Sequence, residues 1–393
     1  MVSPPSPLAA SSAFAQPSDG GSGEVLSGEA VLGWRRRLLE LGGHSSDLDW
    51  LLDLAGGLRW SSLQRLRLEP GTSVRLMRSR QELEAIWCRH RRTSEPLQYL
   101  VGVCPWRDLE LRVAPGVLIP RQETEILVDL ALASLSADRR TIQLAAGPAD
   151  GVIGAGGRAA AWGPGGGNPH GGATSGGGHL GTSARDPRAG TPAPDGEAGA
   201  AAPAGHDAGA SADDQESPGL LWADLGTGSG CVALALARAL PGARGLAVDR
   251  SEQALAQAAH NLTRYGLEKR VNLRQGDWWR GLEPWWGQID LVVANPPYIP
   301  SALIPGLDSV VRDHEPGLAL DGGIDGLEAI RAIAAGARRA LAPGGVLLLE
   351  HHHDQSPAVL ELLAQVGLEA VSAHPDLQGT LRFARAHRSR QHG

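Results

Sequence analysis

Apolar runs of strand length alternate with helix-length segments from Leu220 onward, and this alternation limits the possible folds more than any other feature. Strands that alternate with helices predict a parallel sheet with helices on both faces. The run Leu291-Val292-Val293 is wholly apolar, as expected of a strand buried on both sides. The expected strands are 220–225, 245–248, 271–274, 289–294 and 346–350, closed by a pair at 368–373 and 381–386. The predicted fold class is therefore α/β.

Two segments contain too few large apolar residues to form a core. Residues 1–27 are expected to be a disordered tail and residues 138–218 a disordered insert rich in Gly, Ala and Pro. Removing most of this insert should leave activity and stability nearly unchanged. Its histidines have no metal-ligand spacing, so we expect no metal there; they are His170, His179 and His206.

The remaining sequence divides into three parts. Residues 28–97 contain amphipathic patterns that predict a small helical domain, interrupted at Trp60-Ser61-Ser62 and at Glu69-Pro70-Gly71. Residues 98–137 are expected to form a hairpin linker and the start of the next domain, because residues 108–113 alternate in the manner of a strand. Residues 219–388 form the predicted catalytic domain.

Charge and cysteine usage exclude several classes of protein. A formal net charge of -7 gives no overall attraction to nucleic acid or to an anionic membrane. The cysteines are far apart and form no CxxC pair, which favours a reducing cytoplasm over a disulfide framework; they are Cys88, Cys104 and Cys231. No apolar run reaches the roughly 18 residues that a membrane span needs. Residues 8–15 superficially resemble a signal peptide, but no Lys or Arg precedes Arg35.

A glycine-rich loop follows the first expected strand, at Asp224-Leu225-Gly226-Thr227-Gly228-Ser229-Gly230-Cys231. Glycines allow a ligand to approach the backbone, and the N-terminus of the following helix favours a carboxylate or a phosphate. The loop alone would suit NAD, a nucleotide phosphate or the methionine end of S-adenosylmethionine. The candidate ligand-binding residues are Gly226, Thr227, Gly228, Ser229 and Gly230.

Acidic residues follow the second and third strands. Asp249 lies about twenty residues beyond the glycine loop, where a carboxylate can accept from both hydroxyls of a ribose. Asp249 could instead merely cap the helix that starts at Ser251. Asp277 could accept from an adenine amino group while Trp278 lies along the ring. Core packing is the expected role of three other tryptophans, Trp279, Trp285 and Trp286.

The fourth strand ends in Asn295-Pro296-Pro297-Tyr298, the most specific signal in the chain. Two prolines fix the backbone, so that the Asn295 side-chain oxygen and the Pro296 carbonyl can converge as acceptors on a planar NH2 group. Tyr298 offers a face for the flat group that carries this NH2. A plain Pro-Pro turn is the alternative.

Together these motifs resemble the glutamine methyltransferases of peptide-chain release factors. The resemblance covers about residues 29–136 and 220–388, and it includes Leu118 to Glu125, Glu315-Pro316, Leu320 to Gly323, Leu349-Glu350-His351, Gly379 and Arg382. It implies a Rossmann-like class I methyltransferase sheet and S-adenosyl-L-methionine as cofactor. It also implies that the helical domain docks a class 1 release factor, whose Gly-Gly-Gln glutamine enters the Asn295 pocket.

The resemblance assigns roles to the quoted residues. Asn295, Pro296, Pro297 and Tyr298 would be catalytic. The glycine loop, Asp249, Asp277, Trp278 and Asn295 would bind the cofactor, and no metal is expected. Gln122 and Glu123 stand where the family usually has Pro and Asp, which could shift the substrate loop. Three adjacent histidines at 351–353 could suggest a metal, but neighbouring strand residues point to opposite faces, so a plain strand end is expected.

The expected mechanism is direct transfer of a methyl group to the amide nitrogen, accelerated mainly by positioning and by the two acceptors. An amino methyltransferase acting on adenine or guanine would use the same acceptors on a flipped base. Residues 29–97 contain arginines but little aromatic interleaving, so no stable nucleic-acid partner is predicted. A non-catalytic binding module would not need the amide acceptors, and a nicotinamide oxidoreductase would have no use for them. We expect a monomer in the cytoplasm.

Overall fold

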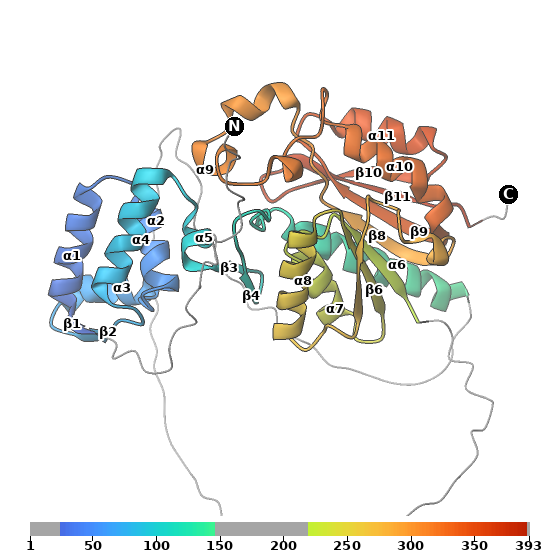
Figure 1. Cartoon of the computed structure of the whole chain (residues 1–393). Coiled ribbons are helices and arrows are strands. Elements are labelled where there is room, and N and C mark those ends of the chain that lie inside the picture. Colours follow the sequence, from blue (N-terminus) through green and yellow to red (C-terminus); the bar gives the residue numbers. More distant parts are fainter. Residues whose placement is uncertain (1–23, 146–218, 391–393) are drawn as a thin grey trace, which may run out of the picture. The chain divides into compact units, whose positions relative to one another are not determined.

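The structure is a computed structural model that describes residues 24–145 and 219–390 (Figure 1). The expected tail and insert lie largely outside these residues. The C-terminal part contains a seven-stranded sheet with the strand order β10-β11-β9-β8-β5-β6-β7. Its strands are β5 (Leu221–Leu225), β6 (Arg244–Asp249), β7 (Val271–Gln275), β8 (Ile289–Ala294), β9 (Leu341–Glu350), β10 (Glu369–Pro375) and β11 (Leu381–His387).

Six of the seven strands run in the same direction, and only β11 runs opposite to them. β6 and β8 both pair with the central strand β5, and β7 and β9 extend the sheet outward in the same direction. The antiparallel pair β10 and β11 adds an edge next to β9. After β5 the chain forms β6 and β7 on one side of this strand and then crosses to form β8 and β9 on its other side. The strand order therefore reverses between β5 and β8. Open α/β sheets bind their ligands at the carboxyl ends of the strands beside such a switch point.

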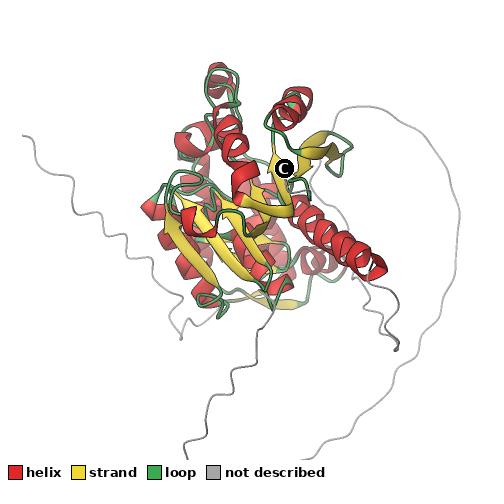
Figure 2. Cartoon of the chain, turned by 90° about the vertical axis from the view of Figure 1, so that its right-hand side faces the viewer, coloured by secondary structure: helices red, strands yellow, loops and turns green. Residues whose placement is uncertain are grey.

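Helices cover both faces of this sheet, which Figure 2 shows as yellow strands among red helices. The helices of this part are α6 (Glu125–Ala145), α7 (Cys231–Ala239), α8 (Glu252–Arg264), α9 (Ser309–Arg312), α10 (Glu328–Ala340) and α11 (Ser356–Gln365). Short 3-10 turns lie at Glu283–Trp285, Ser301–Gly306 and Gly317–Ala319.

Alternate residues of each central strand enter two separate cores. Trp222, Leu291 and Val293 pack with α6 and α7, whereas Val292 and Ala294 pack with α10 and α11. This alternation follows from the two-residue period of a strand. It confirms the predicted sheet buried on both sides and the α/β fold class.

The N-terminal part is helical and has a hydrophobic cluster of its own, which includes the buried side chains of Trp34 and Trp87. Its helices are α1 (Gly28–Glu40), α2 (Ser45–Leu54), α3 (Trp60–Leu68), α4 (Arg80–Thr93) and the short α5 (Leu97–Val101). Helix α4 begins with a capping box in which Ser79 and Glu82 exchange hydrogen bonds. The hairpin that follows consists of β3 (Val103–Trp106) and β4 (Leu109–Arg112), paired antiparallel.

Two of the boundaries expected in the N-terminal part are wrong. The break at Trp60-Ser61-Ser62 is the first turn of α3, which buries Leu63 and Leu66. The tail does not extend to residue 27, because β1 (Val25–Ser27) pairs antiparallel with β2 (Ser73–Arg75). Ser27 also caps α1 by accepting a 3.2 Å hydrogen bond from the Ala30 N–H.

The insert does not begin at residue 138, because α6 continues to Ala145. The first residues of the expected insert contain neither Gly nor Pro before Gly147-Pro148, so nothing in them ends the helix. Within residues 24–145 and 219–390, no helix is both long and apolar enough to cross a membrane.

Candidate active site

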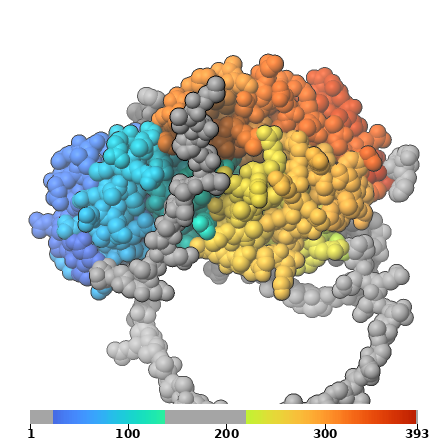
Figure 3. Space-filling view, viewed as in Figure 1, coloured from blue at the N-terminus to red at the C-terminus, as the bar shows by residue number. Residues whose placement is uncertain are grey.

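A cavity lies at the carboxyl ends of the parallel strands, where the switch point predicts a ligand site. It has about 750 Å³ of empty space, part of which is open to solvent. In the space-filling view, the yellow and orange parts of the chain border a hollow (Figure 3). The lining residues of the predicted site are Gly226, Gly228, Asp249, Asp277, Trp278, Asn295 and Pro297.

The glycine loop contributes backbone rather than side chains to this cavity. Gly226 and Gly228 line it, both with positive φ. Gly230 also has a positive φ of 80°, and a Cβ there would lie 2.9 Å from the Cβ of Ala258 in α8. The side chains of Thr227 and Ser229 are buried, and Thr227 Oγ1 donates a 2.7 Å hydrogen bond to Asp224. Thr227, Ser229 and Gly230 therefore shape the loop, and their predicted contact with a cofactor stays a prediction.

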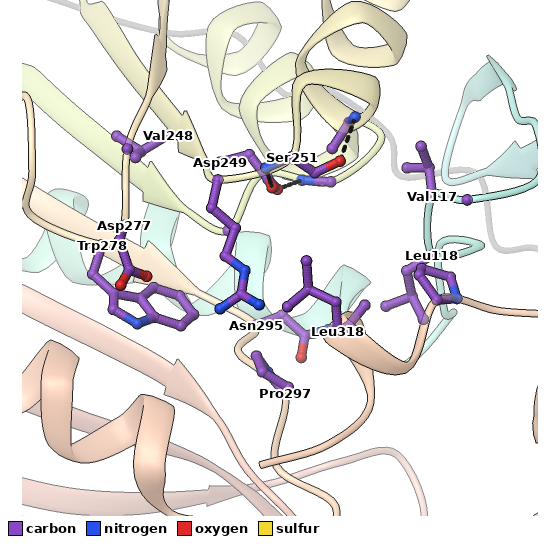
Figure 4. Close-up of a pocket in the computed structure, with 18 residues that line it drawn as sticks. Val117, Leu118, Val248, Asp249, Ser251, Asp277, Trp278, Asn295, Pro297 and Leu318 are labelled. Carbon is purple, nitrogen blue, oxygen red and sulfur yellow. Dashed lines mark hydrogen bonds between the residues drawn. The ribbon is translucent and has the colours of Figure 1, made fainter. Parts of the chain in front are cut away.

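Asp249 connects the ends of β5 and β6. Its carboxylate accepts 2.9 Å hydrogen bonds from the backbone N–H groups of Gly228 and Ser251 (Figure 4). The N-cap of α8 is Ser251, whose hydroxyl accepts from the Ala254 N–H. Burial raises the pKa of Asp249, and the two backbone N–H groups oppose this rise. Asp249 thus orders the loop and also faces the cavity.

Asp277 and Trp278 lie side by side at one end of the cavity, opposite Val117 and Leu118 (Figure 4). The Trp278 ring approaches Gly226 so closely that a Cβ at position 226 would lie 3.4 Å from it. Trp278 has a φ of 53°, a conformation that side chains rarely adopt and that is often found at functional sites. Trp279 is buried and donates a 3.0 Å hydrogen bond to the Ile333 carbonyl, which confirms its core role.

The two other tryptophans assigned to the core are partly buried against the same cluster. Trp285 lies under the Arg274 guanidinium, and Trp286 lies under that of Arg339, at 3.9 Å from the ring centre. Both contacts are away from the cavity residues, so the predicted packing role holds.

A second, smaller cavity adjoins the first, and Asn295 lines both. It has about 410 Å³ of empty space and is lined by Leu118, Arg121, Asn295, Pro296, Tyr298, Ile299, Val311, Ala319 and Leu320. Three members of the Asn-Pro-Pro-Tyr motif therefore line this cavity, whereas Pro297 lines the first. The motif is held in place by backbone hydrogen bonds that join Ile299 to Leu320 and to Gly322.

A chain of buried hydrogen bonds, which the sequence analysis missed, supports the motif from behind. Asn295 Nδ2 donates to Thr124 Oγ1 at 2.9 Å, and Thr124 Oγ1 donates to Glu350 Oε2 at 2.8 Å. The Tyr298 hydroxyl donates to Glu350 Oε1 at 3.1 Å. Thr124 and Glu350 belong to motifs that carried the family resemblance, but sequence alone gave them no role.

Burial raises the pKa of Glu350 to about 7, although the hydroxyls of Thr124 and Tyr298 favour its charged form. Burial also raises the pKa of the Tyr298 hydroxyl, and the nearby Glu350 carboxylate adds to this rise. Tyr298 therefore keeps its proton at neutral pH and acts as a donor.

An ion pair borders the second cavity. Arg121 donates to Glu315 Oε1 at 2.6 Å, and Glu315 Oε2 accepts from the Ile119 N–H at 3.2 Å. The Glu315 side chain is 1% exposed, whereas that of Arg121 is 35% exposed. The pair joins the segment before α6 to the loop after β8.

The histidines at 351–353 follow the end of β9, so the strand alternation expected for them does not apply. His352, His353 and Asp354 bring their ligand atoms within 4.8 Å of one another. His352 Nδ1 already bonds Asp354 at 2.5 Å, as in an ordinary surface pair. Proximity alone does not indicate a metal, because such groups are common at surfaces.

Comparison with known proteins decides the family. A methyltransferase domain model matches residues 217–379. The release factor glutamine methyltransferase of Prochlorococcus marinus is 41% identical over 92% of this chain and 97% of its own length. The protein with the same name from Gloeobacter violaceus is 38% identical over 85% of this chain and 88% of its own length.

The chain belongs to the family of release factor glutamine methyltransferases. A third member, from Synechocystis, is 31% identical over 92% of this chain and 97% of its own length. The matched domain contains both the glycine loop and the Asn295 motif. The predicted family and its methyltransferase activity are thereby confirmed.

Proposed function

We propose that this enzyme methylates the side-chain amide nitrogen of the Gly-Gly-Gln glutamine in class 1 peptide chain release factors, with S-adenosyl-L-methionine as the methyl donor. The observation that carries the proposal is that Asn295 lines two adjoining cavities. A donor in the larger cavity and a glutamine in the smaller one would meet at its side chain. The names of the related enzymes support the same substrate.

The residues of the larger cavity fit the proposed cofactor. Each oxygen of the Asp249 carboxylate accepts one backbone hydrogen bond and retains acceptor capacity for a ribose hydroxyl. Trp278 offers a flat apolar face, and Asp277 beside it is exposed and can accept from an amino group. Gly226 and Gly228 leave the backbone open to the methionine end. When bound, S-adenosylmethionine supplies a methyl group on a positively charged sulfur.

Asn295 and Pro296 would act on the amide nitrogen itself. An amide nitrogen is a poor nucleophile, because its lone pair is delocalised into the carbonyl group. Acceptors that bind its two protons increase the electron density on nitrogen as the new bond forms. The Asn295 side-chain oxygen and the Pro296 carbonyl are the candidate acceptors, and the fixed backbone of Pro296-Pro297 orients them.

The same acceptors would suit the amino group of a flipped base, which is the competing function. Residues 28–97 are proposed to dock the release factor. Two of the tryptophans in this part, Trp34 and Trp87, are buried in its core and cannot stack on bases, whereas Trp60 is 62% exposed. The net charge of -7 also disfavours a polyanion.

The proposal is tested by incubating the protein with radiolabelled S-adenosylmethionine and, in parallel, a release factor, DNA or RNA. We expect label in the release factor alone. Label in a nucleic acid, with none in the release factor, would replace the proposal with the competing function.

A further inference from the structure

The buried hydrogen bonds that run from Asn295 through Thr124 to Glu350 have a fixed donor-to-acceptor direction. Above its pKa of about 7, Glu350 is a carboxylate with only acceptor atoms, so each hydroxyl that bonds it then donates its proton to it. Thr124 has one proton, and it is used in the 2.8 Å bond to Glu350. The Thr124 oxygen can then only accept from Asn295, and it does so at 2.9 Å. The charge of Glu350 thus determines which end of the Asn295 amide faces Thr124.

The consequence for the site is that Asn295 directs its oxygen away from Thr124. Within residues 24–145 and 219–390, no group donates a hydrogen bond to Asn295 Oδ1. This oxygen is therefore free to accept from an NH2 group in the cavities that Asn295 lines. If the amide were turned over, its own NH2 would face the incoming NH2, and two donors would meet.

We propose that Glu350 is a positioning residue for methyl transfer, which fixes the orientation of the Asn295 amide through Thr124 and the orientation of the Tyr298 ring through its hydroxyl. This inference rests on the proposed function, since it assigns Asn295 Oδ1 to the substrate amide. Glu350 itself is 1% exposed and lines neither cavity.

The surroundings of Glu350 are consistent with a group that acts through its neighbours. Glu350 is the last residue of β9, and both of its oxygens are used by hydroxyls from other segments. The charged groups that act on it are Arg382, which favours the carboxylate, and Glu123, which opposes it. Arg382 is itself paired with Asp376 at 2.9 Å. No direct ion pair therefore neutralises Glu350, and the two hydroxyls are its hydrogen-bond partners in the described residues.

Three variants separate positioning from simple packing. Thr124→Ser keeps the hydroxyl, Thr124→Val keeps the shape but removes the hydroxyl, and Glu350→Gln can donate as well as accept. We expect Thr124→Val and Glu350→Gln to lower kcat for release-factor methylation about tenfold to a hundredfold. The KM for release factor and the Kd for S-adenosylmethionine should stay within about twofold, and Thr124→Ser should keep most of the wild-type kcat.

A second readout does not depend on catalysis. In protein labelled with 15N-asparagine, the Asn295 side-chain NH2 signal is identified by its absence in Asn295→Ala. One of its protons should exchange slowly with solvent in the wild type and in Thr124→Ser, but quickly in Thr124→Val. This readout remains valid even if the proposed substrate is wrong, so failure of the two proposals can be distinguished.

The proposal is overturned if Thr124→Val and Glu350→Gln keep wild-type kcat, or if Thr124→Ser loses as much as Thr124→Val. It is also overturned if the variants unfold rather than fold normally with a lower kcat, because the hydrogen bonds among Asn295, Thr124 and Glu350 would then serve stability alone. Unchanged exchange of the Asn295 protons in Thr124→Val would have the same meaning.

Discussion

The carboxylate of Asp249 accepts a 2.9 Å hydrogen bond from the backbone N–H of Gly228, so the acid that ends β6 holds the glycine loop that follows β5. Its other oxygen accepts from Ser251 at the start of α8. One side chain therefore connects the three segments that surround the proposed ribose position. Replacing it should affect both the order of the loop and the binding of a ligand.

We predict that Asp249→Ala weakens binding of S-adenosylmethionine by about 1 to 3 kcal/mol, the scale for charge-assisted hydrogen bonds to two hydroxyls. Titration calorimetry measures the effect. Ser251→Ala is the matched control, because it removes the helix cap and leaves the carboxylate in place. Cofactor affinity within about twofold of wild type in Asp249→Ala would mean that Asp249 serves only the loop and the helix.

Stability should fall as pH rises because of Asp224. This residue is buried, and burial raises its pKa from 3.8 to about 7. Between these two pH values the folded protein holds a proton that the unfolded chain has lost, so raising the pH favours unfolding. Once the pH is above the folded-state pKa of about 7 the loss is complete, and it is on the order of 4 kcal/mol.

Asp224→Asn tests this effect, since an amide keeps the acceptor for Thr227 but does not titrate. As the pH rises from 5 to 8, the free energy of unfolding should fall less in Asp224→Asn than in the wild type. Urea denaturation at both pH values gives the comparison. The same pH slope in both proteins would show that Asp224 is not the titrating group.

The ion pair between Arg121 and Glu315 should stabilise the segment before α6. Arg121→Met leaves the nearly buried Glu315 carboxylate with only the Ile119 N–H as partner, and we expect a loss of about 1 to 3 kcal/mol of stability. Glu315→Gln in the same chain should restore part of the loss. Chemical denaturation of both single variants and the double variant gives the coupling energy, and strict additivity would contradict the expected interaction.

The central sheet could be predicted from sequence because its strands are wholly apolar and regularly spaced. β8 spans Ile289–Ala294, the same residues that the sequence predicted. Weaker local signals failed where tertiary contacts decide the structure. Helix α3 begins at Trp60 because Leu63 and Leu66 are buried, although Ser61 and Ser62 suggested a break. The three-residue strands β1 and β2 are too short to have a recognisable pattern.

The site was predictable where a motif follows a strand and not where two distant segments meet. Asp249, Asp277, Trp278 and Asn295 all line one cavity, as their places at strand ends suggested. The bond from Asn295 to Thr124 joins residues 171 positions apart, and no local pattern reports such a contact. It arises because α6, which follows Thr124, packs in the core beneath β8. The site roles of Thr227 and Ser229 had only their place in the loop as support, and both side chains are buried.

The most direct test of the account is mass spectrometry of the Gly-Gly-Gln peptide from a release factor after incubation with S-adenosylmethionine and either wild-type enzyme or Asn295→Ala. Loss of one catalytic hydrogen-bonding group costs about a hundredfold to a thousandfold in rate, while the proposed cofactor-binding residues Asp249 and Trp278 are unchanged. We predict a methyl group on the glutamine with the wild type, almost none with the variant, and a much smaller change in cofactor affinity. A glutamine left unmodified by the wild-type enzyme, or modified equally by Asn295→Ala, would contradict the account.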